Sequence, residues 1–104
     1  MAAVRTAARF RVTPGKNQEF LGQVAEAKGI ISGLGGSVRV WQATIAGENT
    51  GVVAIVVEHD DIVAYANFSQ KLTADAGWQA LIAKVGANPT ATPLGMSLAT
   101  ELEL

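Results

Sequence analysis

The feature that most restricts the fold of this chain is an apolar run at residues 52–57. Five of its six residues are valine or isoleucine, which branch at Cβ, and the sixth is Ala54. A short β-branched run of this kind predicts a strand that is covered on both of its faces. The fold must therefore supply something to shield two sides of this strand.

Three other segments alternate between apolar and polar residues in the manner of strands: residues 4–12, 37–46 and 93–104. A polar, glycine-containing stretch at residues 47–51 separates the second strand from the apolar run, and this spacing predicts a hairpin. The chain is thus expected to contain four strands.

Two helices are expected between these strands. Apolar side chains recur at helical spacing across residues 16–34, with Thr13 as the expected N-cap and Pro14 in the first turn. The aspartates at residues 60–61 offer a cap for a second helix, which an Asp-Ala-Gly sequence at residues 75–77 should interrupt. One domain over residues 1–104, with the order β-α-β-β-α-β, accounts for all these elements.

This order is that of the ferredoxin-like α+β fold, with a four-stranded antiparallel sheet in the order 4-1-3-2. Right-handed crossovers place both helices on one face of the sheet. The other face then stays bare, although residues 52–57 present apolar side chains to it, and Trp41 and Ile45 are expected there too. An exposed apolar face usually marks an interface, so we expect a homodimer joined through the helix-free sheet faces.

Composition narrows the classes of partner. The 104 residues are 49% hydrophobic and carry a formal net charge of −1, which is enough for a core and gives no basic footprint for nucleic acid. The longest apolar run is far shorter than a membrane helix, and the first residues do not form a secretion signal. We therefore expect a cytoplasmic protein with neither a nucleic-acid partner nor a membrane partner.

Two local patterns carry a resemblance to a known group of proteins. Residues 12–20 read Val-Thr-Pro-Gly-Lys-Asn-Gln-Glu-Phe, and residues 58–61 read Glu-His-Asp-Asp, followed by Ala-Tyr-Ala at 64–66. With the element order, they make the chain resemble the dimeric α+β barrel superfamily, in particular its antibiotic biosynthesis monooxygenase-like and small stress-responsive members. The resemblance implies that two ferredoxin-like subunits join their sheets into a barrel with the helices outside.

The resemblance also implies a place for a ligand, because related enzymes often hold it between the sheet and the second helix. The residues that this favours as a binding site are Phe10, His59, Tyr65, Asn67, Phe68 and Trp78. Aromatic side chains at strand or helix spacing also serve as ordinary core, and both interpretations stay open.

His59 is the only histidine and, with Tyr65, the only candidate for catalysis. It suits a general base or a donor that orients a ligand, and it equally suits a hydrogen-bonded residue at a helix N-terminus. Haem-binding relatives use a histidine in or near the second helix, and residues 60–89 contain none. We expect no cofactor and no metal.

Charged residues lie on single faces of the first and last strands. Arg5, Arg9 and Arg11 share one face of the first, and Glu101 and Glu103 share one face of the last. These strands should be antiparallel neighbours, so the opposite charges are expected to pair across them. An arginine-lined anion site is the alternative.

Two functions fit these observations. One is a homodimer that binds a small apolar or aromatic metabolite in a pocket between the sheet and the second helix. The other is a cofactor-independent, monooxygenase-like enzyme acting on an aromatic or polyketide-like substrate. In the enzyme, binding and desolvation would do most of the work, and His59 or Tyr65 would assist proton transfer.

Overall fold

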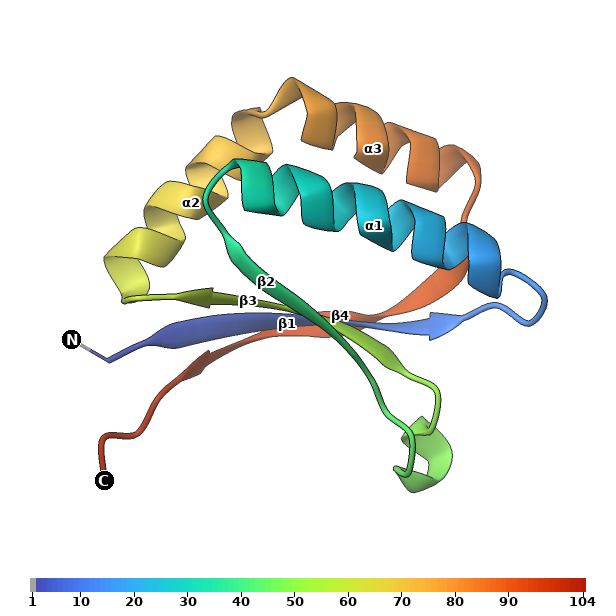
Figure 1. Cartoon of the computed structure of the whole chain (residues 1–104), viewed down its shortest axis with the longest axis horizontal. Coiled ribbons are helices and arrows are strands. Elements are labelled where there is room, and N and C mark those ends of the chain that lie inside the picture. The colour runs from blue at the N-terminus through green and yellow to red at the C-terminus, as the bar shows by residue number, and fades with distance from the viewer. Residues whose placement is uncertain (1) are drawn as a thin grey trace.

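Four antiparallel strands form one sheet in the order β2-β3-β1-β4, with the helices on one side of it (Figure 1). The computed structural model describes residues 2–104. The elements are β1 (Val4–Val12), α1 (Asn17–Gly33), β2 (Ser37–Gln42), the 3₁₀ turn η1 (Gly47–Asn49), β3 (Val53–His59), α2 (Ile62–Ala74), α3 (Ala76–Ala87) and β4 (Ala91–Thr100). The predicted ferredoxin-like order 4-1-3-2 is confirmed, because it is the same order read from the other edge.

The second predicted helix is two helices, so three rather than two cover the sheet. Asp75 ends α2 and caps α3, since its Oδ2 accepts a 2.8 Å hydrogen bond from the Trp78 backbone N–H. Asp61 caps α2 in the same way, through the Ala64 N–H at 2.8 Å. None of the helices within residues 2–104 is both long and apolar enough to cross a membrane.

The start of α1 differs from the prediction. Lys16, not Thr13, is the N-cap residue, and the helix begins at Asn17. Thr13 and Pro14 belong to a tight turn in which the Thr13 carbonyl accepts a 3.0 Å bond from the Lys16 N–H, with Gly15 at a φ of 84°. A proline followed by a glycine fits a turn better than the first turn of a helix, and glycine supplies the positive φ.

The core lies between α1 and the helix-covered face of the sheet. Phe20 and Val24 of α1 pack with Val53 of β3, and Phe10 of β1 and Val40 of β2 join this cluster at its edge. The alternation predicted for residues 4–12 is therefore correct on this side of the sheet.

The helix-free face is less apolar than the sequence suggested. Val4 and Thr6 are buried under the helices, so Arg5 and its alternate neighbours lie on the other side. There β3 contributes only Ala54, Val56 and Glu58. As expected for a single chain, the helices cover only one face of this strand, and the cover of its other face by a second copy stays a prediction. Val53, Ile55 and Val57 share the helix-covered face, so Val56 is the one β-branched side chain that β3 presents to the helix-free face.

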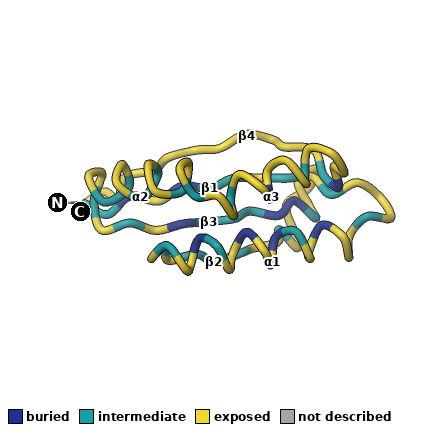
Figure 2. Tube along the Cα trace, turned by 90° about the horizontal axis from the view of Figure 1, so that it is seen from above, coloured by how far each residue is buried: buried dark blue, intermediate teal, exposed yellow. Residues whose placement is uncertain are grey.

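Strand β4 forms an edge of the sheet and extends past the helical layer. It pairs only with β1, and Figure 2 shows it exposed along nearly its whole length. Met96, for example, is 66% exposed. A bulge between Pro93 and Gly95, where Gly95 has a φ of 116°, shifts its register against β1. The regular strand ends at Thr100, before the acidic residues that the sequence assigned to it.

Candidate functional site

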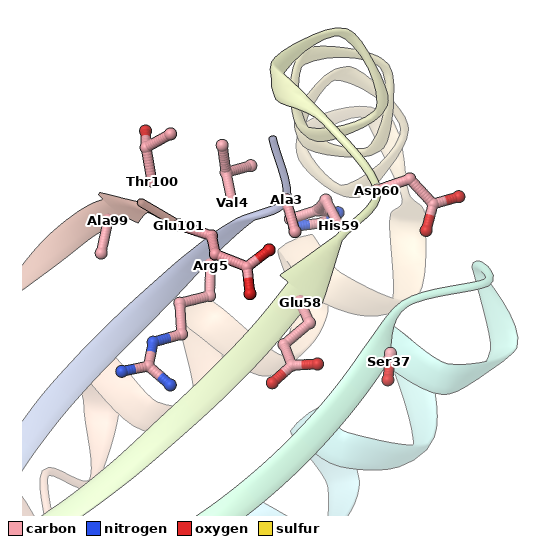
Figure 3. Close-up of a pocket in the computed structure, with 10 residues that line it drawn as sticks. All are labelled: Ala3, Val4, Arg5, Ser37, Glu58, His59, Asp60, Ala99, Thr100 and Glu101. Carbon is pink, nitrogen blue, oxygen red and sulfur yellow. The ribbon is translucent and has the colours of Figure 1, made fainter. Parts of the chain in front are cut away.

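Two adjoining hollows lie at the end of the sheet where β3 leads into α2. The first, of about 500 Å³, is lined by strand-end residues that include Arg5, Glu58, His59 and Glu101 (Figure 3). Arg5 and Glu58 occupy paired positions on β1 and β3 and point to the same side of the sheet. This hollow has both polar and apolar walls and continues onto the helix-free face.

The second hollow, of about 380 Å³, lies between the end of the sheet and α2. Three predicted ligand residues, His59, Asn67 and Phe68, line it. Lys71 lies one helical turn beyond Asn67 and lines it as well. This second hollow adjoins both the sheet and α2, where the resemblance implied a place for a ligand, and we call it the α2 pocket.

His59 lines both hollows, as do Ser37, Glu58 and Asp60. It is the last residue of β3, and its imidazole ring packs 5.1 Å from the ring of Phe68 and 5.5 Å, edge-on, from that of Tyr65. Burial lowers the pKa of His59 below its ordinary 6.5, and the charge of Asp60 offsets part of this effect. A lowered pKa leaves the imidazole neutral at pH 7, so it can accept a proton or a hydrogen bond from a ligand.

The remaining predicted residues lie elsewhere. Tyr65 touches the His59 ring but does not line the α2 pocket. Phe10 packs in the core, with its ring 5.9 Å from that of Phe20. Trp78 belongs to α3 and lines neither hollow. The structure thus brings three of the other five predicted residues, Tyr65, Asn67 and Phe68, to His59 and separates Phe10 and Trp78 from it.

Sequence reasoning missed Lys71 and Glu58. Lys71 was detectable, because residues 64, 67, 68 and 71 share one face of a helix and all line the α2 pocket. Glu58 was not, because its role depends on which strand lies beside it. No group of three or more histidine and carboxylate side chains suited to a metal ion occurs within the part of the chain that the structure describes.

The predicted ion pairs between the first and last strands do not form within the chain. The ion pairs among residues 2–104 are Lys16–Glu19 at 3.5 Å and Lys84–Glu26 at 2.7 Å, both on the helical side. Arg11 instead donates a 3.2 Å hydrogen bond to the carbonyl of Glu48. Pairing fails because Glu101 and Glu103 follow β4 rather than lying in it.

No protein-family model and no curated protein match this sequence. Solved structures resemble it strongly in fold. A NIPSNAP family protein from Agrobacterium tumefaciens superimposes with a TM-score of 0.74 at 20% identity, over 98% of this chain and 86% of its own. An uncharacterised NIPSNAP domain protein from Burkholderia xenovorans gives 0.73 at 22% identity, over 97% and 94%.

A third similar structure is a candidate antibiotic biosynthesis monooxygenase from Bordetella bronchiseptica. It superimposes with a TM-score of 0.64 at 20% identity, over 100% of this chain and 99% of its own. The fold of this chain is therefore the ferredoxin-like α+β fold that these NIPSNAP and monooxygenase-like structures share, as the sequence resemblance predicted.

Proposed function

We propose that this protein is a homodimer that binds a small aromatic metabolite in the α2 pocket of each subunit. The observation that carries the proposal is the pocket itself, in which a neutral histidine and a phenyl ring lie next to polar groups. Small-molecule sites are typically concave, with apolar walls and a few placed polar groups.

The dimer is supported by surface that the single chain leaves uncovered. Trp41 lies on the helix-free face and is 59% exposed. Large side chains of this kind gain free energy when a second subunit removes them from water. A two-fold contact covers both copies at once.

The ligand chemistry follows from the lining. Phe68 and the His59 ring offer flat faces to an aromatic system. Asn67 offers an amide, and Lys71 a cation, to a hydroxyl or carbonyl oxygen on the ligand. A planar phenolic or polyketide-like compound presents both features.

A cofactor-independent, monooxygenase-like reaction is the second candidate. It is favoured by the lowered pKa of His59, because a neutral imidazole can take the proton of a substrate hydroxyl. The resulting substrate anion would supply the electrons for the reduction of oxygen. The resemblance in fold to a candidate antibiotic biosynthesis monooxygenase is compatible with this chemistry.

The test uses 1,5-dihydroxynaphthalene as a probe, followed by amide chemical shifts and by calorimetry. We expect shifts centred on residues 59–71 and weaker binding for Asn67→Ala and Lys71→Ala. Gln70→Ala is the matched control, because Gln70 is exposed on α2 and does not line the pocket. Shifts confined to other regions, or equal affinity for all three variants, would contradict the proposed site.

An oxygen electrode separates the two candidates. An enzyme consumes oxygen in the presence of the probe, and His59→Gln abolishes the consumption without abolishing binding. A binding protein shows the chemical shifts with no oxygen consumption in either form.

A further inference from the structure

All four arginines of the chain lie on the helix-free face of the sheet. Arg5, Arg9 and Arg11 alternate along β1, and Arg39 lies on β2 opposite Val56; all four are exposed. The four lysines, by contrast, belong to the helices or to the N-cap of α1. The strands therefore place their cations on one face only.

Carboxylates do not balance these cations within the sheet. Glu58 is the one acidic residue that the described strands add to this face, and it is paired in register with Arg5. Arg9, Arg11 and Arg39 have no carboxylate opposite them in register. Burying unpaired guanidinium groups between two subunits is costly, so a second copy that covers this face must bring carboxylates with it.

Two carboxylates that follow β4, Glu101 and Glu103, are at the opposite end of the sheet from Arg11. The Glu101 backbone N–H donates a 2.9 Å hydrogen bond to the carbonyl of Ala3, and residues 101–104 are all exposed. Ala3 and Arg11 are eight residues apart along an extended strand, which is roughly 26 Å at the usual rise. Glu101 and Glu103 are therefore too far away to reach Arg11 in their own subunit.

We propose that in the homodimer residues 101–104 of each subunit lie across the Arg9–Arg11 end of the other. This rests on the proposed dimer and adds its orientation and its charge pairing. Glu101 and Glu103 then face the partner subunit's Arg9 and the partner subunit's Arg11. A two-fold axis makes the contact twice, and carboxylate–guanidinium pairs suit such a junction.

Apolar groups support the same orientation. Trp41 lies opposite Ala54, and Arg9 lies opposite the same residue from the other side, so the indole and the guanidinium share one cross-strand row. The tail alternates Glu and Leu, and Leu102 is 77% exposed. Trp41 and Leu102 are both exposed in the single chain, and a second copy would remove them from water.

The test is a charge exchange between two variant chains, read out by sedimentation. Glu101→Arg/Glu103→Arg and Arg9→Glu/Arg11→Glu are each expected to raise the dimer dissociation constant about 10- to 100-fold at low salt. A one-to-one mixture of the two should recover dimers of nearly native affinity, because both junctions of the mixed dimer again join opposite charges. Lys28→Glu, on the outer surface of α1, is the control and should change nothing.

The possible results separate the proposals. Recovery in the mixture supports the tail-to-arginine contact. Variants that remain as dimeric as the native chain overturn the contact while leaving the dimer intact. A native chain that stays monomeric at micromolar concentration overturns both. Salt-sensitive binding of a 20-residue oligouridylate that needs Arg9 and Arg11 would assign the face to nucleic acid instead.

Discussion

The two faces of the sheet are built from alternate residues of the same strands, yet they differ in chemistry. One face carries Val4, Phe10 and Val53 under the helices, and the other carries the four arginines and Trp41 in the open. The first face is completed by the chain's own helices. The second has exposed charge and one large aromatic side chain, which is the composition of an interface rather than of a core.

The largest loss of stability is expected for a substitution in the core on the helix-covered face. Phe20 is buried against Val24 and Val53, so Phe20→Ala should lower the free energy of unfolding by about 3–5 kcal/mol. Leu21→Ala is the control. The Leu21 side chain is 48% exposed, so its truncation should lower the free energy of unfolding by less than about 1 kcal/mol. Urea denaturation measures both, and equal losses would remove the distinction between covered and open positions.

Substitutions on the helix-free face should change the dimer dissociation constant rather than the free energy of unfolding. Trp41→Ala should raise the dimer dissociation constant about 30- to 100-fold, since exposed tryptophans are frequent interface hot spots. Ile82→Ala, an exposed apolar residue on α3, should leave association unchanged. Sedimentation of both variants provides the comparison, and an unchanged Trp41→Ala dimer would place the interface elsewhere.

A third substitution tests how tightly the helical layer closes on the sheet. A Cβ at Gly36 would lie 2.6 Å from Ile31 Cγ2 and 3.0 Å from Phe68 Cε2, so Gly36→Ala should cost about 1–2 kcal/mol and weaken ligand binding. Gly29→Ala in α1 meets nothing within 4 Å and should stabilise by about 0.5–1 kcal/mol. Thermal unfolding of the two variants should shift in opposite directions; shifts of the same sign would contradict the packing.

Helix capping offers a smaller effect with a built-in control. Asp61 accepts the Ala64 N–H, so Asp61→Ala should cost about 1 kcal/mol. Asp60 precedes the cap and makes no capping bond, so Asp60→Ala should cost clearly less. The difference between their urea midpoints measures the cap, and a larger loss for Asp60→Ala would show that the helix begins earlier.

The smallest effect is the pH dependence of His59. Its pKa is lowered in the folded protein, so the unfolded chain binds the proton first as the pH falls. Stability from this group is therefore present above pH 6.5 and is lost as the pH falls from 6.5 toward the lowered value. Because the chain has one histidine, His59→Phe should flatten the dependence between about pH 7.5 and 5.5. Equal slopes for both proteins would contradict the assigned burial.

The sequence was informative where one residue decides one local structure. The alternation of residues 4–12 predicted β1, the aspartates at residues 60–61 predicted the start of α2, and the Asp-Ala-Gly sequence at residues 75–77 predicted the break between α2 and α3. It was less informative where three-dimensional placement decides. Phe10 and Trp78 were grouped with the pocket residues, but Phe10 pairs with Val53, at the opposite end of β3 from His59, and Trp78 lies in α3, beyond the break at Asp75.

The sequence also made the helix-free face look more apolar than it is, and the reason is physical. The run at residues 52–57 is apolar at every position, but the apolar side chains that β3 supplies to the helix-free face are only Ala54 and Val56. The neighbouring strands add the arginines to that side, and neighbours become visible only with the register. A sheet face therefore has to be assessed across strands rather than along one of them.

The most direct test follows the fluorescence of Trp41 in a Trp78→Phe chain while the protein is diluted. If a second copy covers the helix-free face, the emission should move to longer wavelength as the sedimenting mass falls from twice 10.8 kDa to 10.8 kDa. An emission typical of water-exposed tryptophan at every concentration, while the mass still halves on dilution, would mean that the subunits meet through another surface.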